Sequence, residues 1–311
     1  MELFPNTSID FMRQRRLAVI FSAVLLAVSV LSLAVRGLEL GIDFTGGTLI
    51  EVGYGKPVDI ETVRSTLNTA GFTSATVQHF GSGRDVLVRI APRAGESKAE
   101  LSDQVLAALR TGTSDTVDMR RVEFVGPQVG EELAEDGGLA MLIALGAIFV
   151  YVMFRFEWKF SVGAVAALFH DVIIVLGFFS VLGLEFDLTV LAAILAVIGY
   201  SLNDTIVVFD RVRENFRKIR KGDAVKVLNE SINQTLSRTI MTGFTTLLVL
   251  LALFLVGGEL IQGFSIALIV GIVIGTFSSL YVASALTLKL GVSRQDLMPF
   301  AKEGAEADSA P

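Results

Sequence analysis

Three apolar stretches of this sequence contain or adjoin residues that can hold or exchange a proton. His170 and Asp171 stand together in the first, Asn203 and Asp204 interrupt the second, and Arg238 directly precedes the third. A carboxyl group removed from water tends to keep its proton, whereas a nearby guanidinium favours the ionised form. Asp204 and Arg238 therefore form a candidate proton switch. The other three side chains are candidates for a part in proton or substrate traffic.

The composition argues against most other kinds of site. The chain has no cysteine, two histidines and one tryptophan, so disulfides, thiolate metal sites and cysteine nucleophiles are excluded. We expect no metal, no cofactor and no enzymatic activity of the usual kinds. A net charge of −6 also argues against a nucleic-acid partner, which would require a basic surface.

The elements that must position these residues are membrane-spanning helices. The chain is 52% hydrophobic and only 19% charged, with a mean hydropathy of +0.63. A spanning helix needs roughly 20 mainly apolar residues to cross about 30 Å of hydrocarbon. Six stretches qualify or nearly do so: Leu17–Val35, Leu139–Phe154, Phe160–Leu182, Leu188–Phe209, Ile240–Val256 and Gly263–Leu290. The first is interpreted as an uncleaved anchor, because its apolar run is longer than the core of a secretory signal.

The distribution of Lys and Arg sets the expected orientation. Basic residues precede the first span, gather between the second and third and between the fourth and fifth, and follow the sixth, whereas the loops 183–187 and 257–262 have none. Cytoplasmic loops carry this excess, so both termini should be cytoplasmic. The predicted organisation is a cytoplasmic N-terminus (1–16), a first span (17–35), a periplasmic domain (36–138), five further spans with short loops (139–291) and a disordered cytoplasmic tail (292–311).

The exported segment 36–138 has the pattern of a small α+β domain. It carries ten basic and sixteen acidic residues, which accounts for the negative charge of the whole chain. Four extended runs are expected at 48–53, 75–80, 85–91 and 117–125. Helical spacing follows Asp59, and a capping box is formed by Ser97 and Glu100. The resulting order, βαββαβ, predicts a ferredoxin-like fold between spans 1 and 2 of a six-helix bundle.

The depth of each polar residue can be estimated from a rise of 1.5 Å per residue. Asp204 should lie about 24 Å along its helix from Leu188, and Arg238 about 27 Å from Val256, so the two reach similar depths in antiparallel helices. The alternative is that both occupy the cytoplasmic interface, with the side chain of Arg238 extended toward the headgroups. His170 and Asp171 should lie about 14 Å along their span, near the midplane, where a network that fixes helix packing is the alternative.

Other motifs indicate packing or are rejected. Gly271 and Gly275 form a GxxxG pair in the sixth span, which allows close approach of another helix. The segment Gly41-Ile42-Asp43-Phe44-Thr45-Gly46-Gly47 lacks the spacing and the lysine of a phosphate-binding loop, and its glycines suit a tight turn into the sheet. An intramembrane aspartyl protease built on Asp171 and Asp204 is also disfavoured, because the Gly-x-Gly-Asp signature is missing.

Taken together, these motifs resemble the SecF members of the SecD/SecF family of bacterial protein-export membrane proteins, within the resistance-nodulation-division superfamily. The resemblance covers about residues 10 to 292. The motifs that carry it are Gly41–Gly47, Phe154-Arg155-Phe156-Glu157-Trp158, His170-Asp171, Gly199–Arg211, Leu236-Ser237-Arg238-Thr239-Ile240 and Gly275–Tyr281.

The resemblance implies a partner and a source of energy. SecD would supply six further spans and a larger exported domain, and the pair would associate with the SecYEG channel, accessory Sec subunits and the translocating polypeptide in the inner membrane. The pair would use the proton-motive force to drive or complete polypeptide translocation. Asp204 and Arg238 match positions of the family's proton pathway, and His170 and Asp171 match a family motif of less certain role.

Two other functions are compatible with the same sequence. The chain would be a passive scaffold if its buried charges only lock helices while it stabilises SecD and the channel. It would be a small-molecule efflux pump if it worked alone, although a single six-span half lacks the second half that forms an internal interface.

Overall fold

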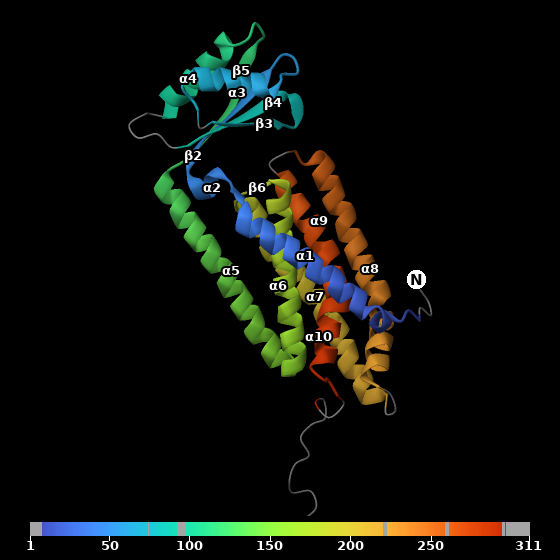
Figure 1. Ribbon diagram of the computed structural model, residues 1–311. Coiled ribbons are helices and arrows are strands. Elements are labelled where there is room, and N and C mark those ends of the chain that lie inside the picture. The colour runs from blue at the N-terminus through green and yellow to red at the C-terminus, as the bar shows by residue number, and fades with distance from the viewer. Residues whose placement is uncertain are drawn as a thin grey trace, which may run out of the picture.

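The computed structural model describes residues 8–73, 75–91, 98–219, 223–258, 261–293 and 296. It has two parts, a bundle of long helices and a small domain with a four-stranded sheet that lies at one end of the bundle (Figure 1). Apart from residues 292, 293 and 296, the tail predicted to be disordered lies outside the described residues. Ser97 of the predicted capping box does too.

Six helical stretches of the described chain are long and apolar enough to cross a membrane. Five are single helices: α1 (Arg15–Val35), α5 (Pro127–Arg155), α6 (Trp158–Leu182), α7 (Leu188–Lys218) and α8 (Ala224–Val256). The sixth combines α9 (Gln262–Phe277), a π-helical segment (Ser278–Ala283) and α10 (Ser284–Lys289). A short 3-10 helix, η1 (Phe11–Arg13), precedes α1.

Several helices are longer than the apolar runs that predict them. Helix α5 begins at Pro127, twelve positions before the apolar run starts at Leu139. Its first turns are acidic and glycine-rich, so hydropathy does not reveal them. Proline is well suited to this first position, where its missing N–H has no helical partner anyway. Helices α7 and α8 likewise continue as polar helices beyond the apolar run, so a hydropathy window marks their middle and not their ends.

The helices form an inner and an outer group. Side chains of α6, α7 and α9 make much of the buried core, with Phe160, Phe179 and Phe209 fully enclosed. Helices α1, α5 and α8 instead turn large apolar side chains outward, among them Leu17, Leu142 and Val249. This outer surface suits lipid or another apolar partner.

Small residues allow the inner helices to approach closely. A Cβ atom added to Gly271 of α9 would lie 2.2 Å from Cγ2 of Val197 in α7. One added to Gly275 would lie 3.0 Å from Cβ of Ser201, one turn further along the same contact. Both members of the predicted GxxxG pair therefore stand where α7 and α9 touch.

The small domain is a sheet covered on one face by two helices. In chain order its elements are β2 (Gly47–Tyr54), α3 (Ile60–Thr69), β3 (Thr76–Phe80), β4 (Ser82–Ile90), α4 (Lys98–Thr111) and β5 (Val117–Val125). The strand order is β3-β4-β2-β5, and every neighbouring pair is antiparallel. The side chain of Asp59 accepts a hydrogen bond from the N–H of Thr62 and caps α3.

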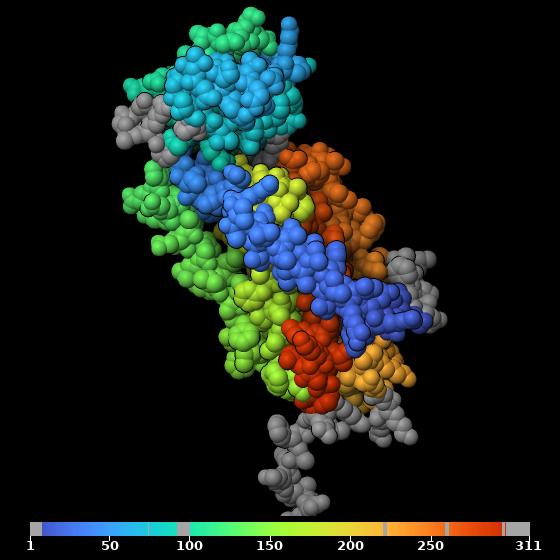
Figure 2. All heavy atoms as spheres, in the orientation of Figure 1, coloured from blue at the N-terminus to red at the C-terminus, as the bar shows by residue number. Residues whose placement is uncertain are grey.

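The alternation of side chains in the strands decides which face is covered. Ile50 and Val88 are paired in the sheet, point toward α3 and α4, and are fully buried with Leu67 and Val105. The opposite face, which includes Leu49, is turned toward the bundle. There it lines a cavity of about 340 Å³ together with bundle residues such as Phe179 and Ile266. The domain thus stands over one end of the bundle, as Figure 2 shows.

A second, two-stranded sheet joins the two parts. Strand β1 (Glu39–Leu40), just after α1, pairs in parallel with β6 (Glu185–Phe186), which lies between α6 and α7. The glycine-rich motif follows β1 and contains α2 (Ile42–Thr45). Gly46 and Gly47 have φ angles of +69° and +133°, and an added Cβ on Gly47 would lie 2.7 Å from the carbonyl oxygen of Ile90. Only glycine fits this turn without strain.

Candidate functional site

Asp171 is the centre of a buried hydrogen-bond network in the bundle. It is 1% exposed. One carboxylate oxygen, Oδ1, lies 2.9 Å from Nδ1 of His170. The other, Oδ2, accepts hydrogen bonds from the hydroxyls of Ser201 in α7 at 2.6 Å and of Ser278 in the π-helical segment at 2.7 Å. Asp171 therefore joins α6 to two other inner helices.

His170 has one ring nitrogen in this network and one outside it. The side chain is 4% exposed, and its Nε2 atom is buried without a hydrogen-bond partner in the described chain. When Nδ1 donates to Asp171, Nε2 is a free acceptor inside the bundle. It can receive a proton or a water molecule there.

Asp204 lies in the same part of the bundle but has quite different surroundings. It is 3% exposed, and its Oδ2 atom is buried with no hydrogen-bond partner among the described residues. The hydroxyl of Thr205, the next residue, is instead paired with that of Ser279 at 2.8 Å. A buried polar atom without a partner costs free energy, so this carboxyl group is a place where a proton or a water molecule can bind.

The structure does not bring Arg238 to Asp204. Arg238 is exposed on α8, and no ion pair or hydrogen bond joins the two residues in the described part of the chain. The next residue, Thr239, is buried, so the inner face of α8 runs through Thr239 and leaves Arg238 outside it. Asn203 is likewise exposed beside the buried Asp204. Similar depth along two helices therefore does not make these side chains face each other here.

Hydroxyl groups that the sequence analysis did not single out complete the site. Thr239 of α8 has a buried hydroxyl oxygen without a partner among the described residues, as Asp204 has, whereas the hydroxyl of Tyr200 in α7 faces those of Thr242 and Thr246 in α8. These two helices pack together, and an added Cβ on Gly243 of α8 would lie 3.6 Å from the hydroxyl of Tyr200. The two unpartnered oxygens of Asp204 and Thr239 are polar groups that a buried water molecule can satisfy. The signal in the sequence is the hydroxyl residues and Gly243 at helical spacing.

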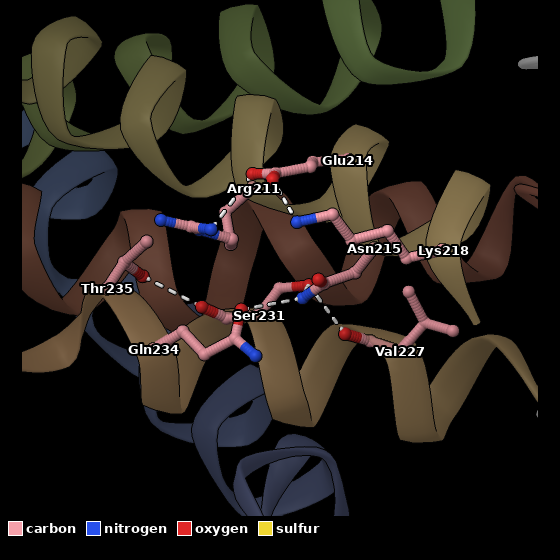
Figure 3. Close-up of polar contacts among 8 residues, drawn as sticks. All are labelled: Arg211, Glu214, Asn215, Lys218, Val227, Ser231, Gln234 and Thr235. Carbon is pink, nitrogen blue, oxygen red and sulfur yellow. Dashed lines mark hydrogen bonds and ion pairs between the residues drawn. The ribbon is translucent and has the colours of Figure 1, made fainter. Parts of the chain in front are cut away.

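A polar layer connects α7 and α8 at the end of the bundle away from the small domain. The amide nitrogen of Asn215 donates to the hydroxyl of Ser231 and to Oε1 of Gln234, both at 2.9 Å (Figure 3). On the other side of α7, Glu214 accepts from Arg211 at 2.9 Å and from Lys218 at 2.6 Å. The two bonds of Asn215 fix the polar extensions of both helices against each other, whereas the ion pairs of Glu214 lie within α7.

A cavity of about 810 Å³ opens beside this layer. It is lined by polar side chains of three segments, among them Asp10, Arg211 and Asn229, and it reaches Ser237, the residue before Arg238. Asn229 donates to Asp10 at 2.8 Å and so ties the segment before α1 to α8. Water that fills this cavity reaches α8 next to Arg238, just before the apolar run that begins at Ile240.

Comparison with known proteins identifies relatives of this architecture. The family described as "Protein export membrane protein SecD/SecF, C-terminal" matches residues 105–293, and the one described as "SecD/SecF GG Motif" matches residues 31–58. The protein translocase subunit SecF of Vibrio alginolyticus is 55% identical over 311 residues, which cover 99% of both chains.

Two solved structures are similar in fold. The crystal structure of SecDF, a translocon-associated membrane protein from Thermus thermophilus, matches with a TM-score of 0.83 and 40% identity over 92% of this chain. SecDF in a super-membrane-facing form matches with a TM-score of 0.68 and 39% identity over the same share. In each case the chain spans only 39% of the length of SecDF.

Proposed function

Because this chain belongs to the SecD/SecF family of protein-export membrane proteins, we propose that it is a non-enzymatic subunit that couples the proton-motive force to polypeptide translocation. The family implies a multi-pass membrane protein of the Sec export machinery that associates with SecD. The proposal adds that protons move through the pair and that their flow helps to pull the polypeptide outward.

One observation carries the proposal. Asp204 is almost fully buried in α7, within the apolar run that ends at Phe209, and one of its oxygens has no partner in the described chain. An ionisable group inside a membrane costs about 2.5–3.5 kcal/mol at the helix centre on insertion scales. A buried ionisable residue in a membrane helix therefore indicates a functional role. Asp171 differs, because its three hydrogen bonds account for its burial as a packing element.

The mechanism follows from these surroundings. Protonation of Asp204 removes a charge from the α7–α8 contact, and release of the proton restores it. Each state favours a different packing of the two helices, so proton passage can drive an alternation between two arrangements of the bundle. One proton crossing 100 mV supplies about 2.3 kcal/mol, and a long stroke needs several. Arg238, exposed on α8, would join Asp204 in the second arrangement or bind a carboxylate of SecD.

The proposal also sets the location and the partners. The bundle would lie in the bacterial inner membrane with both termini in the cytoplasm and the small domain in the periplasm. The acidic small domain and the basic residues at the other end of the bundle support this orientation. SecYEG would be the channel served. We further infer that the small domain is ferredoxin-like, which its strand order and its two helices on one face support.

The test is the substitution Asp204→Asn, which keeps the size of the side chain and removes the ionisable group. Membrane vesicles that contain the variant with SecD and SecYEG are assayed for translocation of a secretory protein, with and without an uncoupler. We expect the uncoupler-sensitive part to disappear while the ATP-driven part remains. Glu214→Gln is the matched control, since it removes a carboxylate from the same helix outside the buried core, and it should keep full sensitivity. Full uncoupler-sensitive translocation in the Asp204→Asn vesicles would refute proton coupling at this residue.

A scaffold function remains the second candidate because Arg238 is exposed at the bundle surface, where it can bind a partner. The substitution Arg238→Met separates the two. Proton coupling predicts lost translocation with normal amounts of the SecD complex. Loss of the complex itself would favour the scaffold.

A further inference from the structure

Arg89 of the small domain binds both strands of the sheet that joins the domain to the bundle. Its Nη1 atom donates to the carbonyl oxygen of Leu40 in β1 at 2.9 Å, and its Nη2 atom forms an ion pair with Glu185 in β6. The two side chains are only 20% and 28% exposed. A guanidinium can hold two acceptors at once in a fixed geometry, which a lysine cannot do as well.

The same junction holds the first turn of α7. The carboxylate of Asp43, in the glycine-rich motif, accepts a hydrogen bond from the N–H of Leu188 at 3.1 Å. Asp187 caps the helix by accepting from the N–H of Val190 at 2.8 Å, and Phe44 stacks on Phe186 with ring centres 5.7 Å apart. The start of α7 is therefore attached to β6, to the motif and, through Glu185, to the small domain.

Charged and polar groups surround Glu185 from every neighbouring element. Arg89 faces it from β4, Gln78 from β3, Asp43 from α2 and Asp187 from the start of α7, and Glu39 is its strand partner in β1. Burial raises the pKa of the Glu185 carboxyl, and Arg89 opposes this by lowering it. Arg89 is thus the cation that allows a partly buried carboxylate to stand at this junction.

A movement at Asp204 has a direct path to this junction. Asp204 lies in the same helix as Leu188, about 24 Å further along. Helix α7 is continuous over that distance, so a shift or tilt near Asp204 displaces its first turn as well. The attachment through β6 and Arg89 passes the displacement to β4, in the middle of the domain sheet.

We propose that Arg89 and Glu185 are positioning residues that transmit the movement of α7 to the small domain. The inference rests on the proposed function, since it names the route by which proton passage at Asp204 reaches the exported domain. It assigns to an ion pair outside the membrane a role in the stroke and none in moving protons.

The test exchanges the two charges. The variants Arg89→Glu, Glu185→Arg and the double exchange are reconstituted with SecD and SecYEG in proteoliposomes. Translocation of a secretory protein and proton flux, followed by a pH-sensitive dye, are measured together. We expect each single reversal to lower translocation per proton about fivefold or more, at the lower end of usual couplings between two sites, with proton flux maintained. The double exchange should recover most of the translocation per proton. Arg89→Lys should give a value between those of the native protein and the single reversals.

The controls separate this role from misfolding and from failure of the proposed function. Arg64→Glu reverses an exposed charge of the same domain, paired with Glu61 far from the junction, and should change nothing. A parallel loss of flux and translocation in the single reversals, without rescue in the double exchange, would show a structural role only and overturn the inference. So would unchanged translocation per proton. If Asp204→Asn keeps its proton coupling, the proposed function fails instead, whatever the charge exchange does.

Discussion

The hydroxyl of Ser278 donates a 2.7 Å hydrogen bond to Oδ2 of Asp171, and this bond connects a π-helical segment to the centre of α6. A π-helical turn leaves the regular hydrogen-bond pattern of a helix and is frequent at functional sites. Here it brings Ser278 to the carboxylate that Ser201 also contacts. The network therefore fixes an irregular part of the sixth span against two regular helices.

Asp171→Asn should destabilise the bundle. The amide keeps one acceptor oxygen but places an N–H₂ group against hydroxyls that donate to the carboxylate, so a loss of about 1–3 kcal/mol is expected. Thermal unfolding in lipid nanodiscs measures it. In the double variant with Ser278→Ala, the total loss of stability should be smaller than the sum of the two single losses, since both residues share one bond. Thr245→Ala is the control, because its hydroxyl donates to the carbonyl oxygens of Met241 and Thr242 in its own helix. Simple additivity would show that the bond contributes nothing.

Gly271→Ala should separate α7 from α9. The new methyl group would lie 2.2 Å from Cγ2 of Val197, which forces one of the helices to move and costs about 1–3 kcal/mol. Val197→Ala in the same chain should restore much of the stability. Gly199→Ala, on α7, should have little effect, because no other element of the described chain has an atom within 4 Å of the new carbon. The unfolding temperatures of the four proteins in the same detergent provide the comparison, and an equal loss at Gly199 would contradict this explanation.

The sequence predicts the large features because they depend on periodicity and composition. Long apolar runs identify the helices α1 and α5 to α9, and strict alternation places Ile50 and Val88 in the domain core. The ends of α5, α7 and α8 were missed, since their polar turns continue the helix without the apolar signal. The π-helical segment has no signal of this kind.

Asp204 and Arg238 reach similar depths along their helices but do not face each other. The rise per residue gives the height of each side chain, but the direction in which it points depends on rotation about the helix axis. A step of one residue turns about 100°, which is why Thr239 lies inside and Arg238 outside. That rotation is set by tertiary packing at Gly243 and its neighbours, which hydropathy does not report. The pathway itself stays a prediction.

Tyr54 should make the small domain sensitive to alkali. Its side chain is 6% exposed, and burial raises the pKa of its hydroxyl to about 12. An unfolded chain loses this proton near 10, so unfolding is favoured as the pH rises from 10 to 12, by up to about 2.7 kcal/mol. The tyrosinate absorbance of the protein, minus that of Tyr54→Phe, gives the titration. A difference spectrum that titrates near 10 in the folded protein would disprove the shift.

The attachment of the small domain to the bundle should strengthen as the pH falls. Burial raises the pKa of Glu185 above the ordinary 4.5 while the domain is attached, and Arg89 only partly opposes this. The attached state then takes up a proton at a higher pH than the detached state. The attached state therefore becomes more stable as the pH falls from above the raised pKa to the ordinary value. Arg89→Gln should move this transition to higher pH, because it removes the cation that lowers the pKa, and Glu185→Gln should abolish it.

Spin labels measure the attachment directly, since the chain has no cysteine of its own. Cysteines at the exposed positions Asn68 in α3 and Leu182 at the end of α6 report the distance between domain and bundle. In the native protein the distance distribution should narrow as the pH is lowered toward the ordinary carboxyl value, and it should stay constant in Glu185→Gln. A distribution that widens on acidification would mean that the ion pair with Arg89, and not burial, dominates the energetics of Glu185.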